Sequence, residues 1–245
     1  MQPFSCYNLS MSDLTSLGIL LLSMLIMAFM QLVPGIFVLF SHYKFGQFSK
    51  LKASDLTIFF ILGAETVVVL FFLAIYAITC ASPAILLATD SNVFAWIMAG
   101  ILIAISLLFF CLYYRRGKTS ELFISRNFAA HCRTRIKTTK SRSEAFLLGF
   151  FAGIPELIFT LPLYVLTTIS VIHLGTNGFE RAGLIILFAI VAIAPLLIFH
   201  CLSATGHHTL ADFTRFRFKN KTFFRFIIPL LYFLIAILII LGVLL

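Results

Sequence analysis

Six long apolar runs constrain this chain more than any other feature of its sequence. They lie roughly at residues 14–40, 56–80, 93–114, 145–171, 183–203 and 226–245. A helix rises about 1.5 Å per residue, so about 20 apolar residues cross the hydrocarbon core of a bilayer. The strands of a transmembrane β-barrel would instead alternate apolar and polar residues over about ten positions, and none of these runs alternates. The runs therefore predict an all-α, polytopic membrane protein with six transmembrane helices.

The balance of residue types agrees with this prediction. Hydrophobic residues make up 61% of the 245 residues and charged residues only 11%, whereas soluble domains carry about 25% charged residues. Such a chain has too little polar surface to cover itself in water, so lipid must surround it. Its length suits a single transmembrane domain over residues 1–245, without a separate soluble domain.

The positions of the basic residues predict the orientation in the membrane. Of the 18 Lys and Arg residues, all but Arg181 fall in the first, third and fifth connections between the runs. Basic residues resist translocation and stay in the cytoplasm. We therefore expect both termini outside, in a multi-pass protein of the plasma (inner) membrane.

The same charges indicate what the cytoplasmic face contacts. A basic surface attracts anionic lipid by about 1 kcal/mol per residue near the membrane, so anionic lipid is an expected partner. The basic stretch RTRIKTTKSR at 133–142 could also suggest nucleic-acid binding. Membrane topology already explains these charges, so we expect no nucleic-acid partner.

The polar stretch 115–143 divides the chain into two similar sets of three runs. Repeat 1 covers about 14–114 and repeat 2 about 144–245, and each begins with a proline-interrupted run, QLVPGIF and AGIPELIF respectively. Because three is an odd number, the second set enters the membrane from the opposite side. The pattern predicts two inverted repeats that build one site at the membrane midplane.

Proline within a helix removes one backbone hydrogen bond and clashes with the preceding turn. Pro34, followed by Gly35, is the weakest point of the first predicted helix, and Pro155 and Pro162 bracket a strained turn of the fourth. In lipid, the freed carbonyls need protein, water or a ligand. The alternative is that each proline produces only a packing kink.

Two glutamates lie at mid-depth in apolar runs, Glu65 in the second and Glu156 directly after Pro155 in the fourth. A lone carboxylate at this depth costs several kcal/mol, and no Lys or Arg lies in any predicted helix core. Each glutamate therefore needs a proton, a cation or an aqueous cavity. The alternative is a protonated glutamate that hydrogen-bonds to a neighbouring helix.

Polar residues near these glutamates extend the candidate site. Gln31 lies one turn before Pro34, Thr66 adjoins Glu65, and Thr160 lies four residues after Glu156 on the same helix face. Oxygen ligands of this kind suit a hard cation or an ammonium group. Taken singly, each residue could equally join two helices by a hydrogen bond.

Other chemistry has weaker support. The five cysteines form no CxxC or metal-type spacing, and no catalytic motif is present. We therefore expect no enzyme activity and no cofactor. One further set could bind a transition metal; it consists of His200, Cys201, His207, His208 and Asp212.

The sequence resembles the LysE / DsbD-CcdA superfamily of six-helix membrane transporters. The resemblance lies in SEAFLLGFFAGIPELIF, in RAGLIILFAIVAIAPLLIF with Pro195, and in the proline-interrupted FMQLVPGIFVLF. It implies six helices, an inverted repeat and a site at the two broken helices. CcdA-type members carry a redox cysteine after each of these prolines, where this chain has Gly35 and Glu156. The redox role is therefore not carried over, and the LysE branch, which exports amino acids and cations, is the closer analogy.

These features predict a secondary membrane transporter or exporter of a small cationic solute or metal ion. The expected site comprises Glu156, Glu65, Gln31, Pro34, Gly35, Pro155 and Thr160. One alternative is a non-transporting membrane subunit that scaffolds a partner complex, and a CcdA-like thiol–disulfide electron carrier is a less favoured one. A protein partner or a homo-oligomer is compatible with either of the first two.

Overall fold

The computed structural model describes residues 11–29, 44, 47–82, 91–113, 132, 134–175, 177–205 and 221–244. Every regular element within these ranges is a helix. The predicted all-helical fold is therefore confirmed for the described part of the chain.

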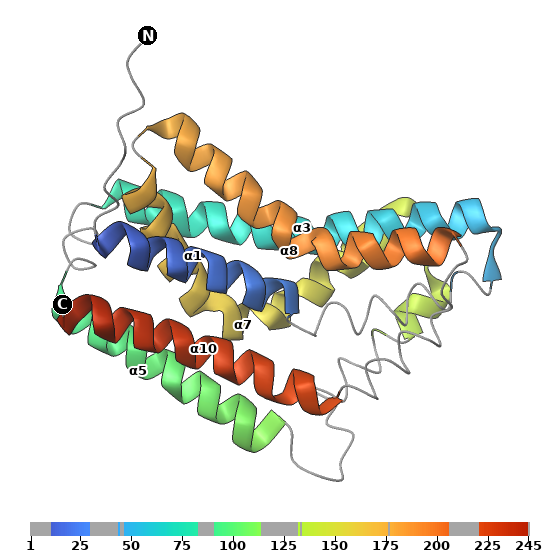
Figure 1. Cartoon of the computed structure of the whole chain (residues 1–245). Coiled ribbons are helices and arrows are strands. Elements are labelled where there is room, and N and C mark those ends of the chain that lie inside the picture. Colours follow the sequence, from blue (N-terminus) through green and yellow to red (C-terminus); the bar gives the residue numbers. More distant parts are fainter. Residues whose placement is uncertain are drawn as a thin grey trace.

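The helices follow the apolar runs of the sequence (Figure 1). Their bounds are α1 Met11–Phe29, α3 Lys50–Ala81, α5 Asn92–Leu108 with a π-helical extension η1 Phe109–Tyr113, α7 Arg142–Leu174, α8 Gly178–Thr205 and α10 Lys221–Leu244. Four of the described helices, namely α3, α5, α8 and α10, are long and apolar enough to cross a membrane, and α7 makes a fifth if its two halves form one span. The apolar part of α1 is shorter, at Asp13–Ala28, and the rest of the predicted first helix lies outside the described residues. Six spans therefore remain a prediction.

Polar caps begin three of the helices. Ser91 accepts a hydrogen bond from the backbone N–H of Phe94 at the start of α5. Ser141 and Glu144 form a reciprocal capping box at the start of α7, and Asn177 accepts from the backbone N–H of Glu180 in α8. Such side chains satisfy the N–H groups that the first helical turn leaves unpaired.

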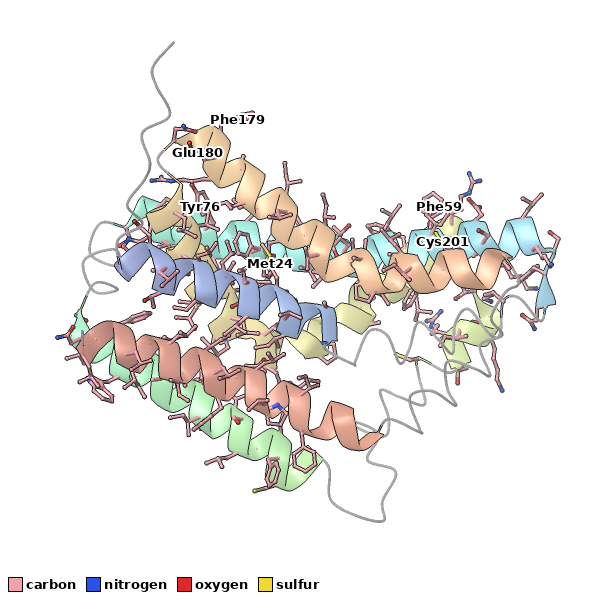
Figure 2. All side chains as sticks on the ribbon, in the orientation of Figure 1. Met24, Phe59, Tyr76, Phe179, Glu180 and Cys201 are labelled. Carbon is pink, nitrogen blue, oxygen red and sulfur yellow. The ribbon has the colours of Figure 1, made fainter. Side chains whose placement is uncertain are left out.

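Consecutive helices run in alternating directions through the molecule (Figure 1). The beginnings of α3 and α7 and the end of α8 lie at one end, which we call the basic end because Lys50, Lys52 and Arg142 lie there. Phe179 and Glu180, at the beginning of α8, lie at the opposite end, whereas Phe59 and Cys201 lie towards the basic end (Figure 2).

The helices pack in a specific set of pairs. Helix α3 packs most extensively against α7, and α5 against α10. Helix α1 contacts α7, α8 and α10, while α3 also contacts α8 and α5 also contacts α7. Helix α1 is therefore central, and its Met24, labelled in Figure 2, is only 4% exposed.

Glycines bring α3 and the first half of α7 into backbone contact. A Cβ atom added to Gly63 would collide with the carbonyl oxygen of Phe146, and one added to Gly149 would collide with that of Phe60. Close helix approach through small residues is the usual way in which membrane helices pack, because lipid provides no hydrophobic drive for their association.

The buried apolar residues fall into two clusters. The small cluster, towards the basic end, consists of Leu56, Phe60, Ile61, Ala64, Ile136, Ala145, Leu148, Ala152 and Leu196. The large cluster fills the rest of the bundle and consists of Ile19, Leu20, Met24, Ile26, Met27, Phe72, Met98, Ala99, Leu102, Phe109, Leu163, Tyr164, Leu166, Val171, Phe188, Ile228, Leu231, Tyr232, Ile235, Ala236 and Ile239. Among the described residues, the core is thus divided into two parts along α3 and α7.

Polar contacts tie the elements of the basic end together. Arg142 pairs with Asp55 through Nε and Oδ2 at 2.6 Å, and the buried Lys44 donates from Nζ to the backbone carbonyl of Thr139. Burial lowers the pKa of Lys44, and the carboxylate of Glu144 partly opposes this shift. These contacts hold residues 44 and 134–140 against the beginnings of α3 and α7.

Arg181, the one basic residue outside the expected loops, has a local structural role at the opposite end. Its Nε donates to the carbonyl oxygen of Gly175 at 2.9 Å, and Nη2 lies 3.4 Å from that of Ile172. A cation at this position caps the last carbonyls of α7 and interacts favourably with the helix dipole. This role accounts for the exception to the charge pattern.

Candidate functional site

Helix α7 bends where the sequence predicted a break. The axes of Arg142–Pro155 and Phe159–Leu174 differ by 88°. Pro155 cannot donate to the carbonyl of Phe151, four residues earlier, and Pro162 cannot donate to that of Ile158. Two such prolines, seven positions apart, leave two carbonyls of this stretch without their helical donors, which favours a bend.

Helix α10 supports the bend from the side. The hydroxyl group of the fully buried Tyr232 donates to the backbone carbonyl of Phe159, at 3.1 Å. Helix α10 is itself held by Ser106 of α5, whose hydroxyl donates to the carbonyl of Pro229 at 2.8 Å. The α5–α10 pair thus supplies a hydrogen bond where the prolines disturb the helical pattern.

Replacing Tyr232 with Phe should lower the stability of the protein by about 1 kcal/mol, the net value of a typical buried hydrogen bond. Thermal unfolding in detergent measures this loss. Tyr76→Phe is the matched control, because Tyr76 is half-buried and makes no hydrogen bond through its hydroxyl to any described residue. Equal melting temperatures for the two variants would contradict a supporting role for Tyr232.

Glu65 lies at the level of this bend. A Cβ atom on Gly153, two residues before Pro155, would lie 3.5 Å from the carbonyl oxygen of Ala64, and Ala64 directly precedes Glu65. Ala64 belongs to the small cluster, whereas Val68, one turn further along α3, packs against the large one. Glu65 therefore lies at the boundary between the two apolar clusters.

The carboxylate of Glu65 is not satisfied by the described part of the protein. Its Oε1 is buried and has no hydrogen-bond partner there. The adjacent Thr66 does not provide one, since its hydroxyl donates to the carbonyl of Leu62 at 2.7 Å. Burying a carboxylate oxygen without a partner destabilises the fold. A proton, a cation or a water molecule at this position would remove that cost.

The other predicted site residues divide into two groups. Pro155 lies at the bend, and Thr160 is fully buried one turn beyond it. Glu156 lies in the bent segment of α7, but its side chain is outside the described residues, as are Gln31, Pro34 and Gly35. The structure thus brings Glu65 to the level of Pro155, and the contribution of the first repeat stays a prediction.

Sequence reasoning missed four polar residues of the membrane core. Tyr232 supports the bend, and the hydroxyl groups of Ser23, Thr167 and Thr168 are buried without a hydrogen-bond partner among the described residues. The only signal in the sequence is that these residues interrupt apolar runs. Their burial and lack of partners could be recognised only from coordinates.

The described residues contain no group of three or more His, Cys, Asp or Glu side chains that could hold a metal ion. Within the set suggested by the sequence, only His200 and Cys201 are described. Nε2 of His200 lies 3.0 Å from Oγ of Ser54, and Cys201 is exposed. His207, His208 and Asp212 lie outside the described residues.

Comparison of the chain with protein-family models, with curated proteins and with solved structures yields no match. The resemblance to the LysE / DsbD-CcdA superfamily therefore rests on the sequence pattern and stays a prediction.

Proposed function

We propose that this protein is a secondary transporter or exporter of a small cationic solute or metal ion. The ion or solute binds at mid-depth, between the bend of α7 and the proline-interrupted segment that follows α1. Glu65 is the described carboxylate ligand, and Glu156, Gln31 and Thr160 complete the site. Pro155, Pro34 and Gly35 interrupt the two helices so that backbone carbonyls can face the bound species.

One observation carries this proposal, namely that the buried Oε1 of Glu65, beside a broken helix, has no hydrogen-bond partner among the described residues. A carboxylate kept for packing would pair with a neighbouring donor, because an unsatisfied buried charge destabilises the fold. A carboxylate that binds a cation and later releases it must have no permanent hydrogen-bond partner in the protein. Broken helices at mid-depth occur where transporters bind their substrates.

The pattern of helix contacts supports the inverted repeat. If the halves are related, α1 corresponds to α7, α3 to α8, and α5 to α10. Under this exchange the α3–α7 contact becomes α8–α1, and α1–α10 becomes α7–α5, all of which are observed. The α1–α7, α3–α8 and α5–α10 contacts each map onto themselves. The exception is α7–α8, whose counterpart α1–α3 is not among the main contacts of the described helices. A pseudo-two-fold axis would therefore pass near the α1–α7 contact, beside the proposed site.

The proposal includes an orientation. The basic end faces the cytoplasm of a cell whose plasma (inner) membrane holds the protein, and both termini face outward. Exposed basic side chains at this end can contact anionic lipid headgroups. They are Lys50, Lys52, Arg135, Lys137, Lys140 and Arg142.

Flux through purified protein in proteoliposomes tests the proposal. Vesicles that contain the protein should take up radioactive Rb⁺ or methylammonium down an imposed gradient faster than protein-free vesicles do, and a panel of divalent metal ions extends the test. Absence of flux for every cation tested, with protein that is folded and inserted, would contradict transport. That outcome would favour the alternative of a membrane subunit that scaffolds a partner complex.

A further inference from the structure

The hydroxyl groups of Ser23, Thr167 and Thr168 differ from other hydroxyl groups inside these helices. The hydroxyl groups of Thr57, Thr66 and Thr79 donate to the carbonyl oxygen four residues earlier, at 2.6, 2.7 and 2.9 Å respectively. This local bond is the common way to satisfy a hydroxyl inside a helix. Those of Ser23, Thr167 and Thr168 make no such bond, although each of the three residues is 0% exposed.

The two threonines belong to one buried face of α7. Thr160, Tyr164, Thr167 and Thr168 recur at helical spacing and are all fully buried. Thr160 lies next to the bend, and Thr168 lies eight residues further, which corresponds to about 12 Å along a helix. The stripe therefore leads from the level of Glu65 towards the end of α7 at Gly175.

Ser23 comes from the helix that packs against α7. Helix α1 contacts α7, and the neighbours of Ser23 on α1, Leu20 and Met24, share the large cluster with Leu166 and Val171 of α7. Three hydroxyls that find no partner among the described residues would each cost about 1–3 kcal/mol in a dry core. Such a cost is avoided if the hydroxyls contact a hydrated or ionic species for part of the time.

We infer that Ser23, Thr167 and Thr168 line a pathway through which a small monovalent cation passes between Glu65 and the Gly175 end of α7. The inference rests on the proposed function and specifies its substrate class. Hydroxyl oxygens are hard, uncharged ligands, which suit alkali metal ions and small ammonium ions better than transition metals. The carboxylate of Glu65 at the inner end of the stripe repels anions, and the uncharged hydroxyls along the stripe suit a singly charged ion better than a divalent one, which prefers carboxylate ligands.

Cysteine accessibility tests the pathway without a transport assay. Ser23→Cys, Thr167→Cys and Thr168→Cys are made in a chain whose own cysteines (Cys6, Cys80, Cys111, Cys132 and Cys201) are replaced. A small cationic methanethiosulfonate reagent should modify the three positions at least about tenfold faster than the controls, because a thiol in a dry apolar site stays protonated and unreactive. The controls are Leu166→Cys, which is buried on α7, and Leu161→Cys, which lies on the outer surface of the same helix with 44% exposure. Equal rates at all five positions would overturn the pathway.

Protection experiments identify the occupant. Rb⁺ or methylammonium should slow modification of Thr168→Cys, and the more protective of the two tells whether the site prefers an alkali metal ion or an ammonium ion. If neither protects, the assignment to monovalent cations is wrong. If the cysteines are accessible but the protein shows no flux, the proposed transport function is wrong, while the stripe is still hydrated. Failure of the proposed function can therefore be distinguished from failure of the pathway.

Thr168→Val provides a second measurement that does not depend on cysteine chemistry. Removing an unpartnered hydroxyl from a dry interface would raise the melting temperature. Removing a hydroxyl from a hydrated pathway should leave the melting temperature unchanged or lower it. A clear rise for Thr168→Val would overturn the inference.

Discussion

Gly149→Ala and Gly63→Ala should each disrupt the contact between α3 and α7 and prevent stable folding. The added methyl group would meet a backbone carbonyl of the facing helix, Phe60 for Gly149 and Phe146 for Gly63. A side-chain tip can move aside, but a backbone atom inside a helix cannot move without the whole helix. Overpacking typically costs about 1–3 kcal/mol and occasionally more, and we expect the upper end or beyond. Thermal unfolding and the yield of monodisperse protein in detergent measure the effect.

Two other glycines are matched controls. Gly100 has no atom within 4 Å of the position of a Cβ, so Gly100→Ala should be neutral or stabilise by up to about 1 kcal/mol through helix propensity. Gly153 lies in the same stripe as Gly149, yet its nearest atoms are at the ordinary contact distance of 3.5 Å, so Gly153→Ala should be tolerated. If Gly149→Ala were as stable as Gly153→Ala, the close packing described for α3 and α7 would be wrong.

Glu65→Gln should reduce cation flux in proteoliposomes by about 10- to 100-fold, since a contact to a charged group contributes about 1.5–3 kcal/mol. The amide keeps the size of the side chain but removes the charge that attracts a cation. The substitution also removes the charge of a carboxylate whose buried Oε1 has no partner among the described residues, so the melting temperature should be unchanged or higher. Loss of flux together with retained stability is the signature of a binding residue.

The control for Glu65→Gln is Glu144→Gln. Glu144 is exposed in the first turn of α7 at the basic end, outside the proposed pathway, and glutamine can keep the capping box, so its substitution should leave flux unchanged. If Glu65→Gln transports as well as the unmodified protein, Glu65 is not a ligand. If both variants lose flux equally, the effect reflects the overall charge of the protein and not the site.

The elements could be predicted from the sequence because the membrane imposes a length on every apolar run. Helices α3, α5, α7, α8 and α10 coincide with five of the six runs. The bend of α7 was also predictable, since Pro155 and Pro162 remove backbone donors at known positions. The bounds were less predictable: α3 begins at Lys50 and not near residue 56, because a helix continues beyond the bilayer wherever neighbouring segments pack against it.

The arrangement of the site could be predicted only in part. Depth in an apolar run identified Glu65, but depth does not reveal whether a carboxylate has a partner, which depends on residues far apart in the chain. The role of Tyr232 depends on a contact with Phe159, 73 positions away. Likewise, the sequence does not distinguish Ser23, Thr167 and Thr168 from the threonines whose hydroxyl groups donate to a carbonyl of their own helix. Only the three-dimensional structure separates the two groups.

The glycine contact between α3 and α7 has a consequence for how the protein can move. The first half of α7 is locked to α3 through the backbone at Gly63 and Gly149, so it cannot slide or rotate independently. Beyond Pro155 the helix leaves that contact, bends by 88° and packs through side chains in the large cluster, with the hydrogen bond from Tyr232 beside the bend. Any swing of α7 is therefore confined to its second half, with Pro155 as the hinge and α3 as the fixed frame.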